Sequence, residues 1–165
     1  MHLSYKYYLQ LIRGKLYDQF FSEMKNGGIL PFMDPTVYRR PLMECSSFIA
    51  SSAFPDPGVH GQGFLARLSG STAEFMDIWK YMFIGPTPIY LNDGGKVEMQ
   101  VVPALPSSLF EDEASDSDPF FDEDGNHIVS FKLFAQILVT YHNPGGKNIY
   151  GKPPNSYTVT MADGS

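Results

Sequence analysis

Cysteine and long apolar runs are scarce in this sequence of 165 residues. Its single cysteine, Cys45, excludes an internal disulfide and fits a reducing compartment. It has no run of 18 apolar residues, the length that a membrane-spanning helix needs, and no apolar core of a secretory signal near its start. We therefore expect a cytoplasmic protein that does not enter a membrane.

Positive charge is also in short supply. The chain has 12 Lys and Arg against 18 Asp and Glu, a formal net charge of −6, and no basic stripe that would indicate a nucleic-acid partner. Eight of the acids lie within residues 111–124, where there is no Lys or Arg. An EF-hand register over 120–131 fails because Phe120 and Phe131 would occupy its first and last ligand positions. The acidic stretch is therefore expected to be a solvated surface loop.

Aromatic residues, in contrast, are abundant at 15% of the chain. They fit an ordinary aromatic core, or a protein whose rings stack on the faces of sugars. Apolar residues recur every three or four positions over 4–25 and 72–84, which predicts two amphipathic helices. One side of the second helix carries large apolar residues (Phe75, Ile78, Trp79, Met82 and Phe83). A further short helix is expected over 48–54.

Beyond residue 88, apolar and polar residues alternate as they do in β-strands. Strands are expected over 96–102, 127–134, 136–141 and 156–161, with a turn at 92–95 before the first. Helices followed by strands predict an α + β chain in series rather than an alternating α/β sheet. We therefore divide the chain into a helical unit, 1–88, and a β unit, 89–165, which includes the acidic loop at 111–126.

Both ends of the sequence look cut. The first helix begins almost at Met1, and the last strand runs into a hairpin turn at 162–164 without a return strand. We expect a piece of a longer protein, with a complete small protein with frayed ends as the alternative. In such a piece Phe75, Trp79 and Phe83 would be partly exposed, and the chain would present apolar patches to solvent.

The stretch HGQGFLARLSGSTAEF, residues 60–75, holds the densest cluster of small hydrogen-bond donors. Its Ser-Thr-Ala-Glu segment fits a capping box, with Ser71 as the N-cap and Glu74 at the third helical position. Ser69 and Gly70 come immediately before it. Amide donors, hydroxyl groups and the positive end of a helix converge here, which favours an anion and makes phosphate the natural candidate. A helix start without any ligand is the alternative.

Two other kinds of site are not supported. The spacing of Gly61, Gly63 and Ala66 matches the loose dinucleotide-binding pattern, but the Pro-rich segment before it is not a strand, and Gly70-Ser71 lacks the lysine of a phosphate-binding Walker loop. The four histidines form no helical pair four residues apart and have no cysteine partner, so no metal site is expected.

Several segments together resemble a known family. The run from Tyr38 to Gly85, including the Ser-Gly-Ser-Thr-Ala turn at 69–73, and the phrase VVPALP at 101–106 are similar to the C-terminal part of inverting glycoside phosphorylases of the cellobiose phosphorylase type. Residues 136–144 resemble a strand of that family's C-terminal β-sandwich, and ARLSGSTAEF is most similar to oligoglucan phosphorylases. The resemblance implies the last helices of an (α/α)6 barrel in 1–88 and part of a β-sandwich in 89–165.

The resemblance also implies an activity. Inorganic phosphate, the co-substrate, would cleave a β-linked gluco-oligosaccharide with inversion and release a sugar 1-phosphate, without any metal or organic cofactor. His2, Ser69, Gly70 and Ser71 would bind the phosphate. The family's general acid, an aspartic acid, and two phosphate-binding arginines lie in earlier helices that nothing in this chain matches. No catalytic residue is therefore assigned here, and the isolated chain is expected to be inactive.

Two alternatives stay open: an inverting glycoside hydrolase on the same scaffold, and a non-catalytic carbohydrate-binding β module preceded by helices. A hydrolase would need a carboxylate as general base and would have no use for an anion-binding turn. The linkage and length of the glucan are left open, as is a homodimer of the complete protein.

Overall fold

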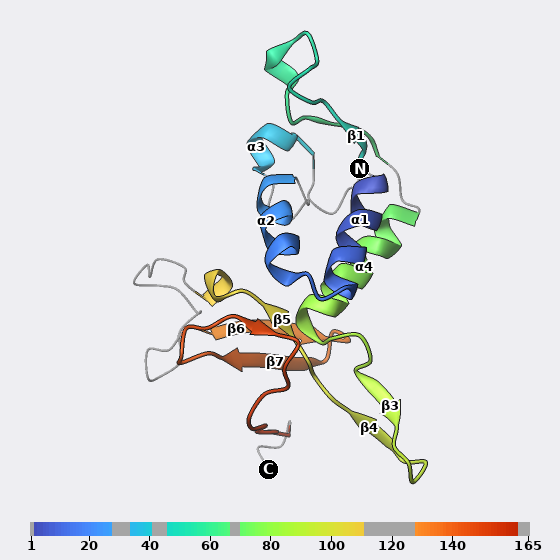
Figure 1. The fold of residues 1–165 in the computed structure, drawn as a ribbon, viewed down its shortest axis with the longest axis vertical. Helices are drawn as coiled ribbons and strands as arrows, with labels where there is room; N and C mark the ends of the chain where they lie inside the picture. Colours follow the sequence, from blue (N-terminus) through green and yellow to red (C-terminus); the bar gives the residue numbers. More distant parts are fainter. Residues whose placement is uncertain (1, 28–33, 41–45, 67–69, 111–127, 162–165) are drawn as a thin grey trace.

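The computed structural model describes residues 2–27, 34–40, 46–66, 70–110 and 128–161 (Figure 1). Four α-helices and two 3₁₀ turns occur in them: α1 (His2–Arg13), α2 (Tyr17–Gly27), α3 (Pro35–Tyr38), η2 (Pro57–Val59), α4 (Gly70–Phe83) and η3 (Ser107–Phe110). The strands are short: β1 (Ser46–Ile49), β2 (Gly63–Ala66), β3 (Ile89–Leu91), β4 (Val97–Met99), β5 (Ala104–Leu105), β6 (Ile128–Leu133), β7 (Ile137–His142) and β8 (Ile149–Tyr150). The acidic loop at 111–126 lies outside the described residues.

The single helix predicted over 4–25 is wrong, because the chain turns between α1 and α2. Lys15 has a left-handed backbone with φ of 60°, and the amide of Leu16 donates to the carbonyl of Leu11 at 3.0 Å. Gly14 precedes this turn and is a poor helix former. The left-handed residue ends α1 and sends α2 back alongside it (Figure 1).

Helix α4 was predicted over 72–84 and is confirmed, and it packs along α1. The ring of Tyr5, early in α1, meets the ring of Phe75, early in α4, with centroids 5.8 Å apart. Arg13, at the end of α1, bonds Asp77 Oδ2 at 2.9 Å and lies over the ring of Tyr81. The contacts advance together along both helices, so α1 and α4 run in the same direction and begin at the same end of the molecule (Figure 1).

The hydrophobic core joins the helices to the strands. Its buried members come from α1, α2, α4, β5, β6 and β7 and from connecting segments (among them Tyr5, Leu9, Ile12, Phe20, Ile78, Met82, Val101, Leu105, Leu133 and Tyr141). Phe75 is only 4% exposed, so the expectation that it is partly exposed is wrong: its ring packs against that of Tyr5. Trp79 and Phe83 are half-buried, as expected, and stack on each other with centroids 4.8 Å apart.

The strands form four separate two-stranded antiparallel sheets, β1–β2, β3–β4, β5–β8 and β6–β7. The predicted strands at 96–102, 127–134 and 136–141 are confirmed as β4, β6 and β7, and 92–95 forms the turn between β3 and β4. Residues 156–161 form no strand, and they pair with none of the strands that the structure describes. The helix expected over 48–54 is wrong, because β1 pairs there with β2.

The helical and β parts of the chain touch through the end of α4. The ring of Phe83 lies 5.1 Å from that of Phe131 on β6, and the hydroxyl of Tyr141 on β7 donates to the carbonyl of Phe83. The described residues form no closed barrel. A partial (α/α)6 barrel followed by part of a β-sandwich therefore stays a prediction. Within the described ranges, no helix has the length and apolar character to cross a membrane.

Candidate functional site

The residues predicted to hold phosphate lie at helix starts. His2 is the first residue of α1, and Gly70 and Ser71 are the first two residues of α4. Ser69 lies outside the described residues, and so do the side chains of His2 and Ser71. Because α1 and α4 run in parallel, their first turns share one end of the molecule (Figure 1). The structure thus brings together backbone segments that are 68 positions apart in the sequence.

The capping box predicted for α4 needs correction. The helix begins at Gly70, so Ser71 belongs to its first turn and is not its N-cap. Glu74 lies one turn into the helix, and its Oε2 atom is buried without a hydrogen-bond partner among the described residues. That oxygen does not cap the helix. The first turn of α4 therefore offers backbone N–H groups that have no partner within the helix itself.

A hairpin made of β1 and β2 rises from the same end of the molecule (Figure 1). Its base rests on Tyr38, which is fully buried and whose hydroxyl lies 2.7 Å from Ser46 Oγ in a hydrogen bond. Gly63 lies against both side chains and leaves no room for a Cβ atom. Only four residue steps connect Ala66 at the end of β2 to Gly70, which limits their separation to about 14 Å. The hairpin is thus held close to the start of α4.

Hydrogen bonds fasten the loop that joins the two strands. Arg39, in a left-handed conformation after α3, donates to the carbonyl of Gly58 at 3.2 Å and to Gln62 Oε1 at 3.4 Å. The ring of His60 bonds the carbonyl of Phe54 through Nε2 at 2.7 Å. These contacts span the loop from both sides and give it a fixed shape.

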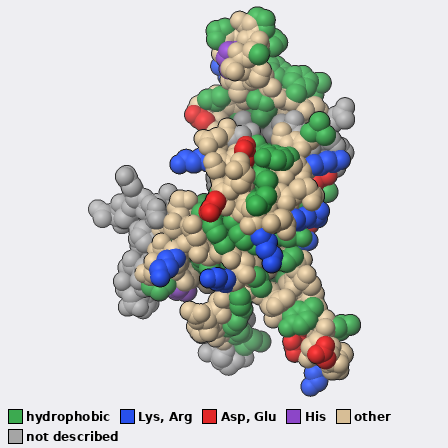
Figure 2. Space-filling view, viewed as in Figure 1, with side chains coloured by type: hydrophobic (Ala, Val, Ile, Leu, Met, Phe, Trp, Pro, Cys, Tyr) green, Lys and Arg blue, Asp and Glu red, His purple; other side chains and the backbone are tan. Residues whose placement is uncertain are grey.

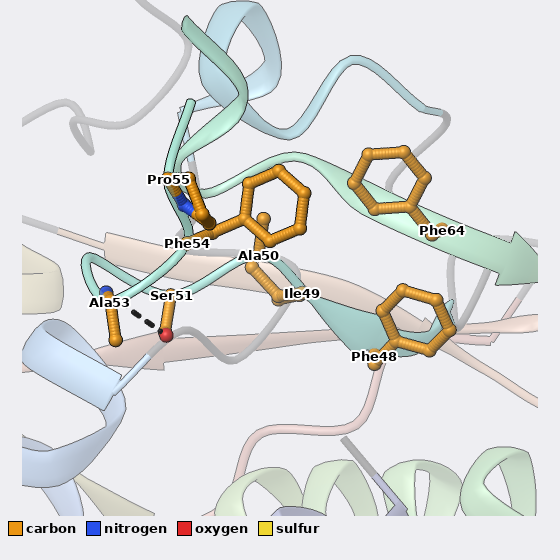
Figure 3. A pocket seen from close by; sticks show the side chains of 8 residues that line it. All are labelled: Phe48, Ile49, Ala50, Ser51, Ala53, Phe54, Pro55 and Phe64. Atoms are coloured by element: carbon orange, nitrogen blue, oxygen red, sulfur yellow. Dashed lines mark hydrogen bonds between the residues drawn. The ribbon is translucent and has the colours of Figure 1, made fainter. Parts of the chain in front are cut away.

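The hairpin carries an open cavity of about 430 Å³ with a mostly apolar lining. Its lining comes from one continuous segment and the facing strand (Phe48, Ile49, Ala50, Ser51, Ala53, Phe54, Pro55 and Phe64). Figure 3 shows the rings of Phe48 and Phe64 together on one side and the ring of Phe54 with Pro55 on the other. The first two rings stack with centroids 5.7 Å apart and planes inclined by 17°. Phe48 and Phe54 nevertheless keep 50% and 52% of their surface exposed.

Sequence reasoning missed this cavity because it expected a helix over 48–54. The available signal was the Pro57-Gly58 turn, with Phe48 before it and Phe64 after it. In the part of the chain that the structure describes, no Asp, Glu, Lys, Arg or His lines the cavity. Among the described residues, no three His, Cys, Asp or Glu side chains group as a metal site would require.

Comparison with models of protein families, with curated proteins and with solved structures finds no match for this chain in any of the three. Its function therefore has to be argued from its own residues and geometry.

Proposed function

We propose that this chain carries part of the phosphate site of an inverting glycoside phosphorylase that acts on β-glucosidic linkages. The observation that supports this most directly is the parallel packing of α1 and α4. It places the first turns of both helices, with His2 in one and Gly70 and Ser71 in the other, at one end of the molecule. Each helix start carries a partial positive charge, so two of them together favour a multiply charged anion such as phosphate.

In this reaction phosphate replaces the activated water of an inverting hydrolase. A phosphate oxygen forms a bond to the anomeric carbon while the bond to the glycosidic oxygen breaks on the opposite face, so a β-linkage yields an α-configured sugar 1-phosphate. The backbone N–H groups of the first turn of α4 would hold the phosphate oxygens in place. A general acid must protonate the leaving oxygen, and we assign it to a part of the protein outside this chain.

The reaction can be tested directly on the complete protein. β-Linked gluco-oligosaccharides are incubated with inorganic phosphate, and the products are followed by ³¹P NMR. We expect α-configured glucose 1-phosphate and a glucan shorter by one unit, in equal amounts. Release of free glucose at a rate that does not depend on phosphate would refute the phosphorylase and favour the hydrolase.

Variants at the start of α4 test where phosphate binds. Gly70→Val should obstruct the approach of the anion to the backbone, and Ser69→Ala should remove a hydroxyl donor that is worth about 1–3 kcal/mol if it bonds a charged group. Both should raise the Michaelis constant for phosphate and leave that for the glucan unchanged. Ser107→Ala, at the start of η3, is the matched control. Unchanged phosphate kinetics in both site variants would mean that α4 begins without an anion.

A further inference from the structure

We propose that the cavity of the β1–β2 hairpin binds a glucosyl unit of a β-linked glucan by stacking on Phe48 and Phe54. The identity of the sugar rests on the proposed function, whereas the cavity itself is defined by its own residues.

The two rings are exposed in a hollow. Phe48 and Phe54 leave about half of their surface open to solvent, 50% and 52%. Figure 2 shows hydrophobic side chains gathered at the tip of the molecule that carries the hairpin loop. Large apolar side chains that remain exposed side by side mark binding surfaces more often than isolated ones do.

The lining selects for an uncharged ligand with an apolar face. Among the described residues no ionisable side chain lines the cavity, so none of them would neutralise a phosphate or a carboxylate there. Aromatic rings bury flat apolar surfaces well, and a β-linked glucopyranose presents such a surface because all its ring C–H bonds are axial. Ser51 Oγ accepts a hydrogen bond from the amide of Ala53 at 3.2 Å, so its own O–H can donate to a sugar hydroxyl (Figure 3). A volume of about 430 Å³ is at the lower end for small-molecule sites and suits one or two sugar rings.

The cavity is also held ready for a ligand. Arg39 ties the loop to the segment after α3, and the bond from His60 fixes the backbone at Phe54. A binding surface that is already ordered loses little conformational entropy when it takes up a ligand.

The position of the hairpin connects the cavity to the proposed phosphate end. The chain between Ala66 and Gly70 reaches at most about 14 Å, less than the length of three sugar units at roughly 5 Å each. Phe64, the strand partner of Phe48, lies six residue steps before Gly70 and at most about 21 Å from it, so a glucan of four or five units can lie on Phe48 and still extend to the start of α4. The cavity would hold the glucan at a distance from the bond that is cleaved.

Binding is measured by calorimetric titration of the complete protein, without phosphate, with cellotetraose and laminaritetraose as β-linked probes and maltotetraose as an α-linked control. We expect at least one β-linked probe to bind and maltotetraose not to bind. Phe48→Ala and Phe54→Ala should each raise the dissociation constant about tenfold, since each removes one stacking surface. Phe54→Tyr keeps the ring and should bind as the original protein does. Phe134→Ala, which removes a phenyl group that is 64% exposed on the β6–β7 turn, is the matched control and should bind normally.

Three results would overturn the proposal: no binding of either β-linked probe, equal affinity in Phe54→Ala and Phe54→Tyr, or a dimer that Phe48→Ala converts to monomer while glucan affinity stays the same. The last result would make the cavity a contact between copies. The two proposals fail separately. Glucan binding that depends on Phe48 in a protein that forms no sugar phosphate would support the cavity and refute the phosphorylase. Phosphorolysis that is slowed by Gly70→Val, in a protein whose glucan affinity is unchanged by Phe48→Ala and Phe54→Ala, would support the phosphorylase and refute the cavity.

Discussion

Gly63 on β2 is the position where the smallest change should have a large effect on the hairpin. A Cβ atom placed there would lie 2.9 Å from Cζ of Tyr38, and closer still to another ring atom and to Ser46 Oγ. Tyr38 and Ser46 are both buried, with 0% and 1% of their surface exposed, so neither can swing into solvent. Overpacking of this kind costs about 1–3 kcal/mol. Loss of the Tyr38–Ser46 hydrogen bond adds about 1 kcal/mol. We therefore expect Gly63→Ala to lower the free energy of unfolding by ~2–4 kcal/mol.

Urea denaturation followed by circular dichroism measures this change. Gly145→Ala is the matched control, because no atom outside its immediate neighbours lies within 4 Å of the added Cβ and its φ is not positive. The double variant Ser46→Ala/Gly63→Ala should lose less stability than the two single variants added together, since Ser46→Ala removes one of the clashing atoms. Equal stability of Gly63→Ala and Gly145→Ala would refute the packing argument. It would also contradict the close packing at the base of the hairpin that carries the proposed glucan cavity.

Two further predictions concern charge. Asp77 bonds Arg13 and Lys80, each at 2.9 Å, but all three side chains are more than a third exposed. Asp77→Asn should therefore cost only about 0.5–1 kcal/mol, and the difference from the original protein should shrink in 0.5 M salt, as urea denaturation can show. Burial, and then the nearby Asp18 carboxylate, raises the pKa of Tyr150 to about 12. Because the unfolded phenol ionises near pH 10, Tyr150 stabilises the fold below that pH, and this contribution is lost as the pH rises toward 12. Tyr150→Phe should flatten the decline of stability measured across that range, and an equally steep decline would contradict the assignment.

Local patterns in the sequence predicted α4, β6 and β7. Helix α4 and strand β6 turn one face inward with a regular period, whereas β7 buries chiefly Tyr141. The local patterns failed where the structure depends on distant partners. The turn at Lys15 interrupts a continuous amphipathic pattern. It lets α2 pack against α1, a contact that the local pattern does not predict. The segment that forms β1 was predicted to be helical because its strand partner is not local: Phe64 lies 16 positions from Phe48. Residues 156–161 alternate like a strand but have no strand beside them in the described structure.

The two candidate sites also differ in how far the sequence predicted them. Ser-Gly-Ser-Thr at 69–72 predicted a helix start with an anion, and the helix start is confirmed within two residues. That α1 begins at the same end could not be derived from the sequence, since it depends on contacts such as Tyr5 with Phe75. The cavity was missed altogether, because its rings come together only through the pairing of β1 with β2.

Helix α4 is the element on which the proposed phosphate site depends, and the contacts at its C-terminal end determine how firmly it is held. There the carbonyl of Phe83 accepts the hydroxyl of Tyr141, and burial raises the pKa of that phenol well above its usual value. Gly85 follows with φ of 89°, and a Cβ there would approach the carbonyl oxygen of Val102 to 2.8 Å. The C-terminal end of α4 is therefore locked into the β part of the chain by contacts that permit little adjustment. Helix α4 has 14 residues and packs along α1, so this anchor and the contacts with Tyr5 and Arg13 together position its first turn, which carries the proposed phosphate site.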